Sequence, residues 1–300
     1  MESGTLPSDP VEDAVAASEK GRREFNPERH VYEPHRVGLP PMGAYLREVW
    51  RRRSFAYEMS RTTLRAQHFK TGLGQLWLVL NPLLLCAVYF MLVDIVRHGN
   101  RPPNYFAHLV AALFFYHYYS GAVNQSARSV IGGGRLVLNT AFPRTLLPLS
   151  SVLTAFKRFL PTLLIYAVVH VASGLPIGLH LIMAIPVILL LTAFTAGMAM
   201  LVSAAQVYFR DVASFLPYIL RIWMYATPVL YFVEDVPDRY HWLLDINPLT
   251  PFFGAWSDML DLGLWPSATD LLWALGSATV AVVVGGLFFI SREREFAVRL

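Results

Sequence analysis

Between residues 176 and 202 the sequence is PIGLHLIMAIPVILLLTAFTAGMAMLV, without a single Asp, Glu, Lys or Arg. A transmembrane helix needs about 20 predominantly apolar residues, so this segment is long enough to cross a bilayer. Five further apolar segments flank it, at residues 76–96, 105–123, 146–171, 215–232 and 271–290. The sequence therefore predicts an all-α integral membrane protein, with six transmembrane helices in a domain that spans residues 74–291.

The composition supports a membrane protein and argues against a soluble one. Hydrophobic residues make up 55% of the 300 residues and charged residues 15%, whereas a soluble domain has about 25% charged residues. The net charge of +4 arises from basic residues beside the apolar segments, where they act as topology signals. We therefore expect no nucleic-acid partner.

The N-terminal region is predicted to have two parts. Residues 1–41 contain six prolines and many charges but no apolar run of signal-peptide length, which indicates a disordered cytoplasmic tail. Residues 42–73 are predicted to form an amphipathic helix in the membrane interface and an entrance loop. The helix has apolar residues at helical spacing, flanked by arginines. The alternative is a soluble helix that packs on a partner.

The distribution of Lys and Arg predicts the orientation in the cytoplasmic (inner) membrane. With both termini in the cytoplasm, including the 292–300 tail, nineteen Lys and Arg lie on the cytoplasmic side and three on the outer side. This bias follows the positive-inside rule for a multi-pass protein. The long outer segment 233–270 is acidic and contains short aromatic pieces, which favours re-entrant helices between spans five and six. An ordinary loop anchored by its tryptophans is the alternative.

Motifs for catalysis, nucleotide binding and metal binding are not found. Gly132-Gly133-Gly134 lacks the Lys-Ser/Thr of a P-loop and is interpreted as a flexible loop. The nine histidines are scattered, and we expect no metal site and no catalytic residues. Charges inside the spans still need a partner or water. Lys157 and Arg158 can extend toward the inner surface. Arg221 faces a hydrated cavity or subunit interface, or else pairs with Asp211.

Five short motifs, in this order, resemble the permease subunit of type-2 ABC exporters of lipid-linked polysaccharides. This family exports O-antigen, teichoic acid and cell-wall galactan. The motifs are Thr71–Trp77 with Asn81-Pro82, Phe142-Pro143-Arg144 with Leu147-Pro148, Tyr208–Val212, Thr227–Tyr231 with Asn247–Thr250, and Arg292–Phe296.

The resemblance implies a half-transporter that pairs as a homodimer and binds two separate ATPase subunits, which would hold ATP and Mg²⁺. It therefore implies no cofactor in this chain and no enzyme activity of its own. The implied channel entrance for the lipid head consists of Lys70, Leu73, Gly74 and Trp77. The implied ATPase-coupling residues are Arg135, Phe142, Pro143, Arg144, Arg210 and Asp211. The implied outer gate contains Asn247, Pro248, Phe252 and Trp256.

A sugar polymer needs a surface that holds it weakly, and aromatic rings stack on sugar faces without fixing a register. The candidates are Tyr89, Phe90, Phe115, Tyr116, Tyr119, Trp223, Tyr225 and Tyr231. The alternative is that they are core or interface-belt aromatics. The predicted function is export of a lipid-linked polysaccharide. A type-2 exporter of a small lipid or drug, a membrane-embedded glycolipid enzyme and a passive channel remain alternatives.

Overall fold

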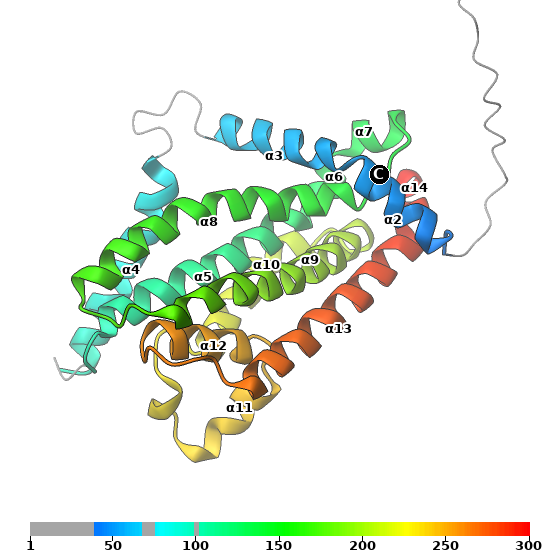
Figure 1. The fold of residues 1–300 in the computed structure, drawn as a ribbon. Coiled ribbons are helices and arrows are strands. Elements are labelled where there is room, and N and C mark those ends of the chain that lie inside the picture. The colour runs from blue at the N-terminus through cyan, green and yellow to red at the C-terminus, as the bar shows by residue number, and fades with distance from the viewer. Residues whose placement is uncertain (1–38, 68–75, 99–101) are drawn as a thin grey trace, which may run out of the picture. The chain divides into compact units, whose positions relative to one another are not determined.

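The computed structural model describes residues 39–67, 76–98 and 102–300, and every regular element in these residues is a helix. The all-α prediction is therefore confirmed. The longer helices are α2 (Met42–Arg51), α3 (Arg53–Gln67), α4 (Trp77–Val96), α5 (Tyr105–Ala127), α8 (Leu146–Ala172), α9 (Ala184–Tyr208), α10 (Val212–Ala226), α12 (Thr250–Leu260) and α13 (Ala268–Arg292) (Figure 1). The shorter elements are α6 (Ser129–Gly132), α7 (Gly134–Asn139), η2 (Leu179–Met183), η3 (Val233–Asp235), η4 (Asp238–Tyr240), α11 (His241–Ile246), η5 (Glu293–Glu295) and α14 (Phe296–Arg299). Lys70, Leu73 and Gly74 lie outside the described residues, as does most of the predicted tail.

The helices coincide closely with the predicted spans, but their lengths confirm only part of the six-span count. Within the described residues, three helical segments are long and apolar enough to cross a membrane: Leu146–Ala172, Leu179–Tyr208 and Ala268–Arg299. The apolar segments Leu80–Val96 and Val212–Ala226 are shorter. Helix α5 has 23 residues, but they include four tyrosines and two histidines, which lower its hydropathy.

Helix α5 lies at the centre of the bundle. Of its 23 residues 17 are buried, and it packs against α4, α8, α9, α10 and α12. In a membrane this contact set stabilises the bundle mainly through van der Waals packing of the buried side chains. The position of α5 follows from its sequence, because Ala107–Tyr116 offers alanines and large rings that interlock on all sides.

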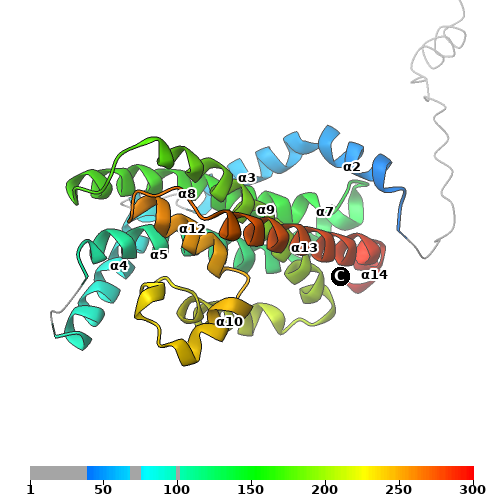
Figure 2. The ribbon, with the colours of Figure 1, turned by 60° about the horizontal axis from the view of Figure 1, so that its bottom comes forward.

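Helices α9 and α13 lie side by side with unusually close backbones (Figure 2). A Cβ added to Gly285 would overlap the carbonyl group of Gly197, and a Cβ added to Gly197 would overlap the backbone of Ala281. Small residues at such positions let two membrane helices approach closely, so van der Waals contact replaces the hydrophobic effect as the driving force.

Helix α8 ends in a Schellman motif. Gly174 has φ +67° and its N–H donates to the Val171 carbonyl at 3.1 Å, while the Leu175 N–H donates to the His170 carbonyl at 3.2 Å. Glycine adopts this left-handed conformation without steric cost, so the sequence Ser173-Gly174 stops the helix and turns the chain toward η2 and α9.

One sequence prediction is corrected here. Gly132-Gly133-Gly134 is not a flexible loop, because α6 ends at Gly132 and α7 begins at Gly134. A Cβ at Gly133 would lie 3.1 Å from the Ser129 carbonyl oxygen and 3.3 Å from the Leu147 side chain, so this glycine serves close packing. Helix α4 contains the motif residues Asn81-Pro82 and continues through them from Trp77 to Val96, with Pro82 buried.

The predicted fifth span is also too long. Helix α10 ends at Ala226, six residues before the predicted boundary, and the following Thr227 and Val229 are fully buried without being helical. The predicted amphipathic helix is in fact two helices, α2 and α3, which meet at Arg52.

Candidate functional site

Helices α2, α7 and α14 gather at one end of the described bundle, and α11 and α12 lie at the opposite end (Figure 1). We call these the α14 end and the α12 end. Residues predicted to couple to an ATPase lie at the α14 end, and residues predicted to form the outer gate lie at the α12 end. The two groups are therefore separated along the bundle.

At the α14 end, Glu293 joins three segments that are far apart in the sequence. Glu293 is only 9% exposed, and its Oε1 accepts a hydrogen bond from the Arg144 backbone N–H at 2.5 Å. Its Oε2 accepts one from the Tyr45 hydroxyl, which also lies 3.0 Å from Thr145 Oγ1. The Arg144 side chain donates in turn to the Glu293 carbonyl oxygen. Helix α2, the turn before α8 and the segment after α13 are thus bonded together.

The Tyr45 phenol is protonated, as its hydrogen bond to the Glu293 carboxylate requires. Burial, and then the adjacent Glu293 carboxylate, raises the pKa of the Tyr45 phenol well above its usual value. The hydroxyl therefore remains protonated and donates to the carboxylate. A charge-assisted bond of this kind contributes about 1.5–3 kcal/mol.

Further contacts connect the turn before α8 to the α2–α3 junction. Arg52 Nη1 donates to the Ala141 carbonyl oxygen at 2.8 Å, and the rings of Phe55 and Phe142 lie 5.1 Å apart. Pro143 is buried beneath them. The predicted coupling residues Phe142, Pro143 and Arg144 thus all contact, or lie beside, the predicted interfacial helices.

The other two predicted coupling arginines line one cavity of about 410 Å³. Arg135 comes from α7 and Arg210 from the turn between α9 and α10, and Arg299 of α14 adds a third guanidinium group. No acidic side chain is among the described residues that line it. The α14 end therefore presents a hollow lined by three guanidinium groups, of which Arg299 lies 3.7 Å from the Glu295 carboxylate.

The turn that carries Arg210 is clamped by Gln206. The Gln206 amide donates to the Arg210 carbonyl at 2.7 Å, and its Oε1 accepts from the Ala213 N–H at 2.5 Å. Asp211 occupies the N-cap position of α10, but its side chain makes no capping hydrogen bond. Gln206 supplies that bond instead, so α9 and α10 are joined rigidly through one side chain.

At the α12 end, Asn247 holds the non-helical segment that follows α10. Its Oδ1 accepts from Trp223 Nε1 at 2.7 Å and from the Leu249 N–H at 3.0 Å. Its Nδ2 donates to the Ala226 carbonyl at 3.0 Å and to Thr227 Oγ1 at 2.9 Å. All the hydrogen-bonding groups of this buried amide are used, and Pro248 follows it at the start of the turn into α12.

Helix α12 inserts an aromatic face into the bundle. Phe252 is fully buried and its ring lies 5.4 Å from that of Phe194. The Trp256 ring stacks on Phe115 at 4.3 Å with an interplanar angle of 4°. Phe252 and Trp256, predicted as gate residues, are therefore packed against α5 and α9 in this conformation.

A buried polar pair also binds α12 to α5. His108 Nδ1 and Asp261 Oδ2 lie 2.6 Å apart, with side chains 4% and 8% exposed. Ser257 Oγ donates to the same carboxylate oxygen at 2.7 Å. The sequence analysis did not identify this pair, because the two residues are separated by 153 positions.

The predicted channel aromatics fall into three groups. Phe115, Tyr116 and Tyr119 are at most 2% exposed and are core residues of the single chain, which is the alternative that the sequence left open. Tyr225 is 47% exposed and its hydroxyl lies 3.2 Å from that of Tyr89. The remaining three contact neighbours at the α12 side: Phe90 on Phe106, Trp223 on Asn247, and Tyr231 on the Tyr225 carbonyl.

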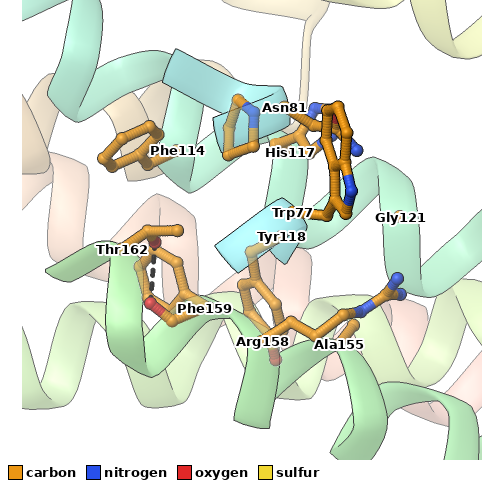
Figure 3. A pocket seen from close by; sticks show the side chains of 11 residues that line it. Trp77, Asn81, Phe114, His117, Tyr118, Gly121, Ala155, Arg158, Phe159 and Thr162 are labelled. Atoms are coloured by element: carbon orange, nitrogen blue, oxygen red, sulfur yellow. Dashed lines mark hydrogen bonds between the residues drawn. The ribbon is translucent and has the colours of Figure 1, made fainter. Parts of the chain in front are cut away.

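Trp77, predicted near the channel entrance, lines a cavity of about 350 Å³ between α4, α5 and α8 (Figure 3). Arg158, His117 and Tyr118 line it as well. A second cavity of about 260 Å³ lies between α4, α5 and α10, and its walls include Arg221 and Tyr89. Arg221 therefore faces a cavity, and no ion pair with Asp211 is formed among the described residues.

Several important residues were missed by sequence reasoning. Tyr45, Gln206 and Glu293 each join distant segments, yet each lies in an ordinary local pattern. Glu293 belongs to the Arg292–Phe296 motif, and this was the one available signal. The sequence predicts that Lys157 extends toward the inner membrane surface. In the structure its side chain reaches α3, where Nζ lies 3.7 Å from the centre of the Tyr57 ring.

Comparison with known proteins gives the family of the chain. The family model of the ABC-2 type transporter matches residues 59–260. An O-antigen export system permease protein RfbA of Klebsiella pneumoniae is 29% identical over 236 residues, covering 78% of this chain and 90% of that protein. An O-antigen export system permease protein RfbA of Myxococcus xanthus is 27% identical over 254 residues, covering 84% and 97%. The chain belongs to the ABC-2 type transporter family of membrane proteins.

Proposed function

We propose that this chain is the membrane permease subunit of an ABC exporter that carries a lipid-linked polysaccharide across the cytoplasmic membrane. The observation that carries the proposal is the similarity, over most of the chain, to proteins named as O-antigen export system permeases. The energy is supplied by a separate ATPase subunit, which holds ATP and Mg²⁺. Two copies of this chain form the complete membrane part, with two ATPase subunits.

In the proposed topology six segments cross the membrane and both termini are cytoplasmic. The three long apolar segments support half of this count, and α4, α5 and α10 supply the other crossings. Nineteen Lys and Arg against three support the orientation, in which the α14 end is cytoplasmic. Helices α11 and α12 then form a re-entrant pair on the outer side, where the buried aromatic face of α12 favours insertion.

The ATPase docks at the α14 end in this proposal. The cavity lined by Arg135, Arg210 and Arg299 presents positive charge, and the Glu293 cluster connects α2 to the turn before α8. A displacement of α2 or of the turn before α8 therefore moves these two elements together. From Arg210 the Gln206 clamp carries the displacement into α10.

Along the path of the polymer, we propose that the exposed rings contact the sugars. Tyr225 and Tyr89 are on the open side of α10 and α4 and have hydroxyl groups that hydrogen-bond weakly to one another. Phe115, Tyr116 and Tyr119 support this wall from the core. Asn247, Pro248, Phe252 and Trp256 hold the outer side closed in the absence of substrate.

Depletion of the full chain in its host tests the function. We expect the lipid-linked polymer to accumulate on the cytoplasmic side, and re-expression of the wild-type chain to restore its export. Affinity purification of the chain should recover a P-loop ATPase. Normal export in depleted cells contradicts the proposal. If depleted cells export polysaccharide normally but no longer export a small lipid, the result favours the alternative of a small-lipid exporter.

A further inference from the structure

Helix α5 leaves one stripe of its surface uncovered, and this stripe is polar. The residues of α5 that are not buried are Phe106, His117, Ser120, Gly121, Asn124 and Gln125. From His117 onward they recur every three or four residues and therefore lie on one side of the helix. A polar surface on the central helix of an apolar bundle faces water or a polar ligand, because contact with lipid tails leaves its hydrogen-bonding groups unsatisfied.

An arginine lies on each side of this polar stripe. Arg158 of α8 donates through Nη2 to Gln125 Oε1 at 2.9 Å and lines the cavity of about 350 Å³ (Figure 3). Arg221 of α10 lines the cavity of about 260 Å³. His117 and Gly121 line both cavities, so the two are adjacent along α5.

Neither arginine has an acidic partner among the described residues. No Asp or Glu is among the described residues that line the two cavities, and the ion pairs of the described chain include neither Arg158 nor Arg221. Arg158 is 12 residues into a candidate membrane span, or about 18 Å from its start at 1.5 Å per residue. A charge at such depth is costly unless it is paired or hydrated, which leaves room for an anion from outside the chain.

We propose that Arg158 and Arg221, on either side of the α5 stripe, bind the phosphate group of a lipid. A guanidinium group presents its N–H donors in a planar fork that matches phosphate oxygens, and Asn124, Gln125 and His117 offer further hydrogen bonds. Each cavity exceeds the roughly 30 Å³ that one water occupies by several fold, so a phosphate group fits. The inference deepens the proposed function, because the exported lipid is one source of this phosphate. Membrane phospholipid is the other source.

Binding of geranylgeranyl diphosphate to the full-length chain tests the site directly. The chain is placed in phosphatidylcholine nanodiscs, and retention of radiolabelled diphosphate is measured by filtration. Arg158→Gln and Arg221→Gln are each expected to weaken binding about tenfold or more, the loss of one charge-assisted hydrogen-bond pair. Arg158→Lys should retain part of the affinity. Lys157→Gln is the matched control, because Lys157 lines neither cavity and lies over Tyr57; we expect its affinity to stay within about twofold.

A steric variant keeps the inference testable if the charge variants fold poorly. A Cβ at Gly121 would meet no atom within 4 Å, so Gly121→Leu projects into the junction of the cavities without disturbing the bundle. We expect it to weaken diphosphate binding as strongly as the charge variants do. Gly276→Leu on α13 is the control, since a Cβ there also meets no atom within 4 Å and the residue lines neither cavity.

A competition arm separates the two sources of phosphate. If diphosphate binding is the same in dodecyl maltoside, which carries no phosphate, and in phospholipid nanodiscs, the site is selective for the exported lipid, and this supports the inference. Weaker binding in the nanodiscs also supports the phosphate site and assigns it to membrane phospholipid. Unchanged affinity in both Arg158→Gln and Gly121→Leu overturns the inference. The proposed function survives that result if depletion of the chain still blocks export in cells.

Discussion

Replacing Gly285 by alanine tests whether backbone contact holds α9 and α13 together. A Cβ at Gly285 falls on the carbonyl group of Gly197, closer than the 3.0 Å that real Cβ contacts respect. The atoms it meets are backbone, so no side chain can turn away to make room. The Cβ would lie 2.0 Å from the Gly197 oxygen, so the two groups must separate by roughly 1.5–2 Å to restore the ordinary contact distance of about 3.5–4.0 Å.

The cost follows from this overlap. Overpacking a close contact costs about 1–3 kcal/mol, and we expect the upper value because α9 and α13 form the most extensive helix pair of the described chain. The higher helix propensity of alanine offsets up to about 1 kcal/mol. The net loss of about 2 kcal/mol lowers the midpoint of thermal unfolding by about 4–8 °C for a domain of this size.

The assay is thermal unfolding of the purified chain in detergent, followed by tryptophan fluorescence. Gly286→Ala is the matched control in the same helix, because its Cβ would meet only the flexible end of Met200 at 3.6 Å. We expect Gly286→Ala to leave the midpoint unchanged or raise it. Equal midpoints for Gly285→Ala and the wild type, or equal losses in the two variants, would refute the close-packing argument.

Four further predictions concern the two ends of the bundle. Glu293→Gln should reduce export at normal expression and cost about 1–2 kcal/mol in unfolding free energy, measured by denaturant titration, because its bonds lose their charge assistance; wild-type export would contradict a role in coupling. Asn247→Ala should cost about 2–3 kcal/mol by leaving the Trp223 indole N–H and the Ala226 carbonyl unsatisfied, and an unchanged melting midpoint would contradict this. Asp261→Asn should increase hydrogen exchange in α12, since weakening the buried hydrogen bonds from His108 and Ser257 costs about 1–3 kcal/mol; unaltered protection would argue against the pair as a tether. Arg210→Ala should abolish export in cells while the chain still reaches the membrane, and undiminished export would count against its coupling role.

Most of the helix positions could be predicted from the sequence. A long run of uncharged, apolar residues in a membrane protein usually forms a helix, because the helix satisfies its own backbone hydrogen bonds. The boundaries of α5 and α8 lie within a few residues of the prediction for this reason. The end of α10 could not be predicted, because the chain after Ala226 remains apolar. The Ala226 carbonyl accepts a hydrogen bond from the Asn247 side chain, 21 positions farther along, and not from continued helix.

The site was predictable where a motif supplied it and not where tertiary contact created it. Arg135 and Arg210 were both selected from the sequence, and the structure places them on one cavity. The bonds between Tyr45 and Glu293 join residues 248 positions apart, and neither residue stands out locally. The Gly132–Gly134 run was misinterpreted because glycine permits both loose turns and tight packing, and only the neighbouring Leu147 decides between them.

The shortness of α10 has a consequence for the surrounding bilayer. Its 15 residues span about 22 Å, whereas the hydrocarbon layer is about 30 Å thick. Lipids adapt to such hydrophobic mismatch by local thinning beside the protein. In the proposed topology the two leaflets therefore approach each other along α10, and a headgroup that crosses beside this helix travels a shorter apolar distance than through an undisturbed bilayer.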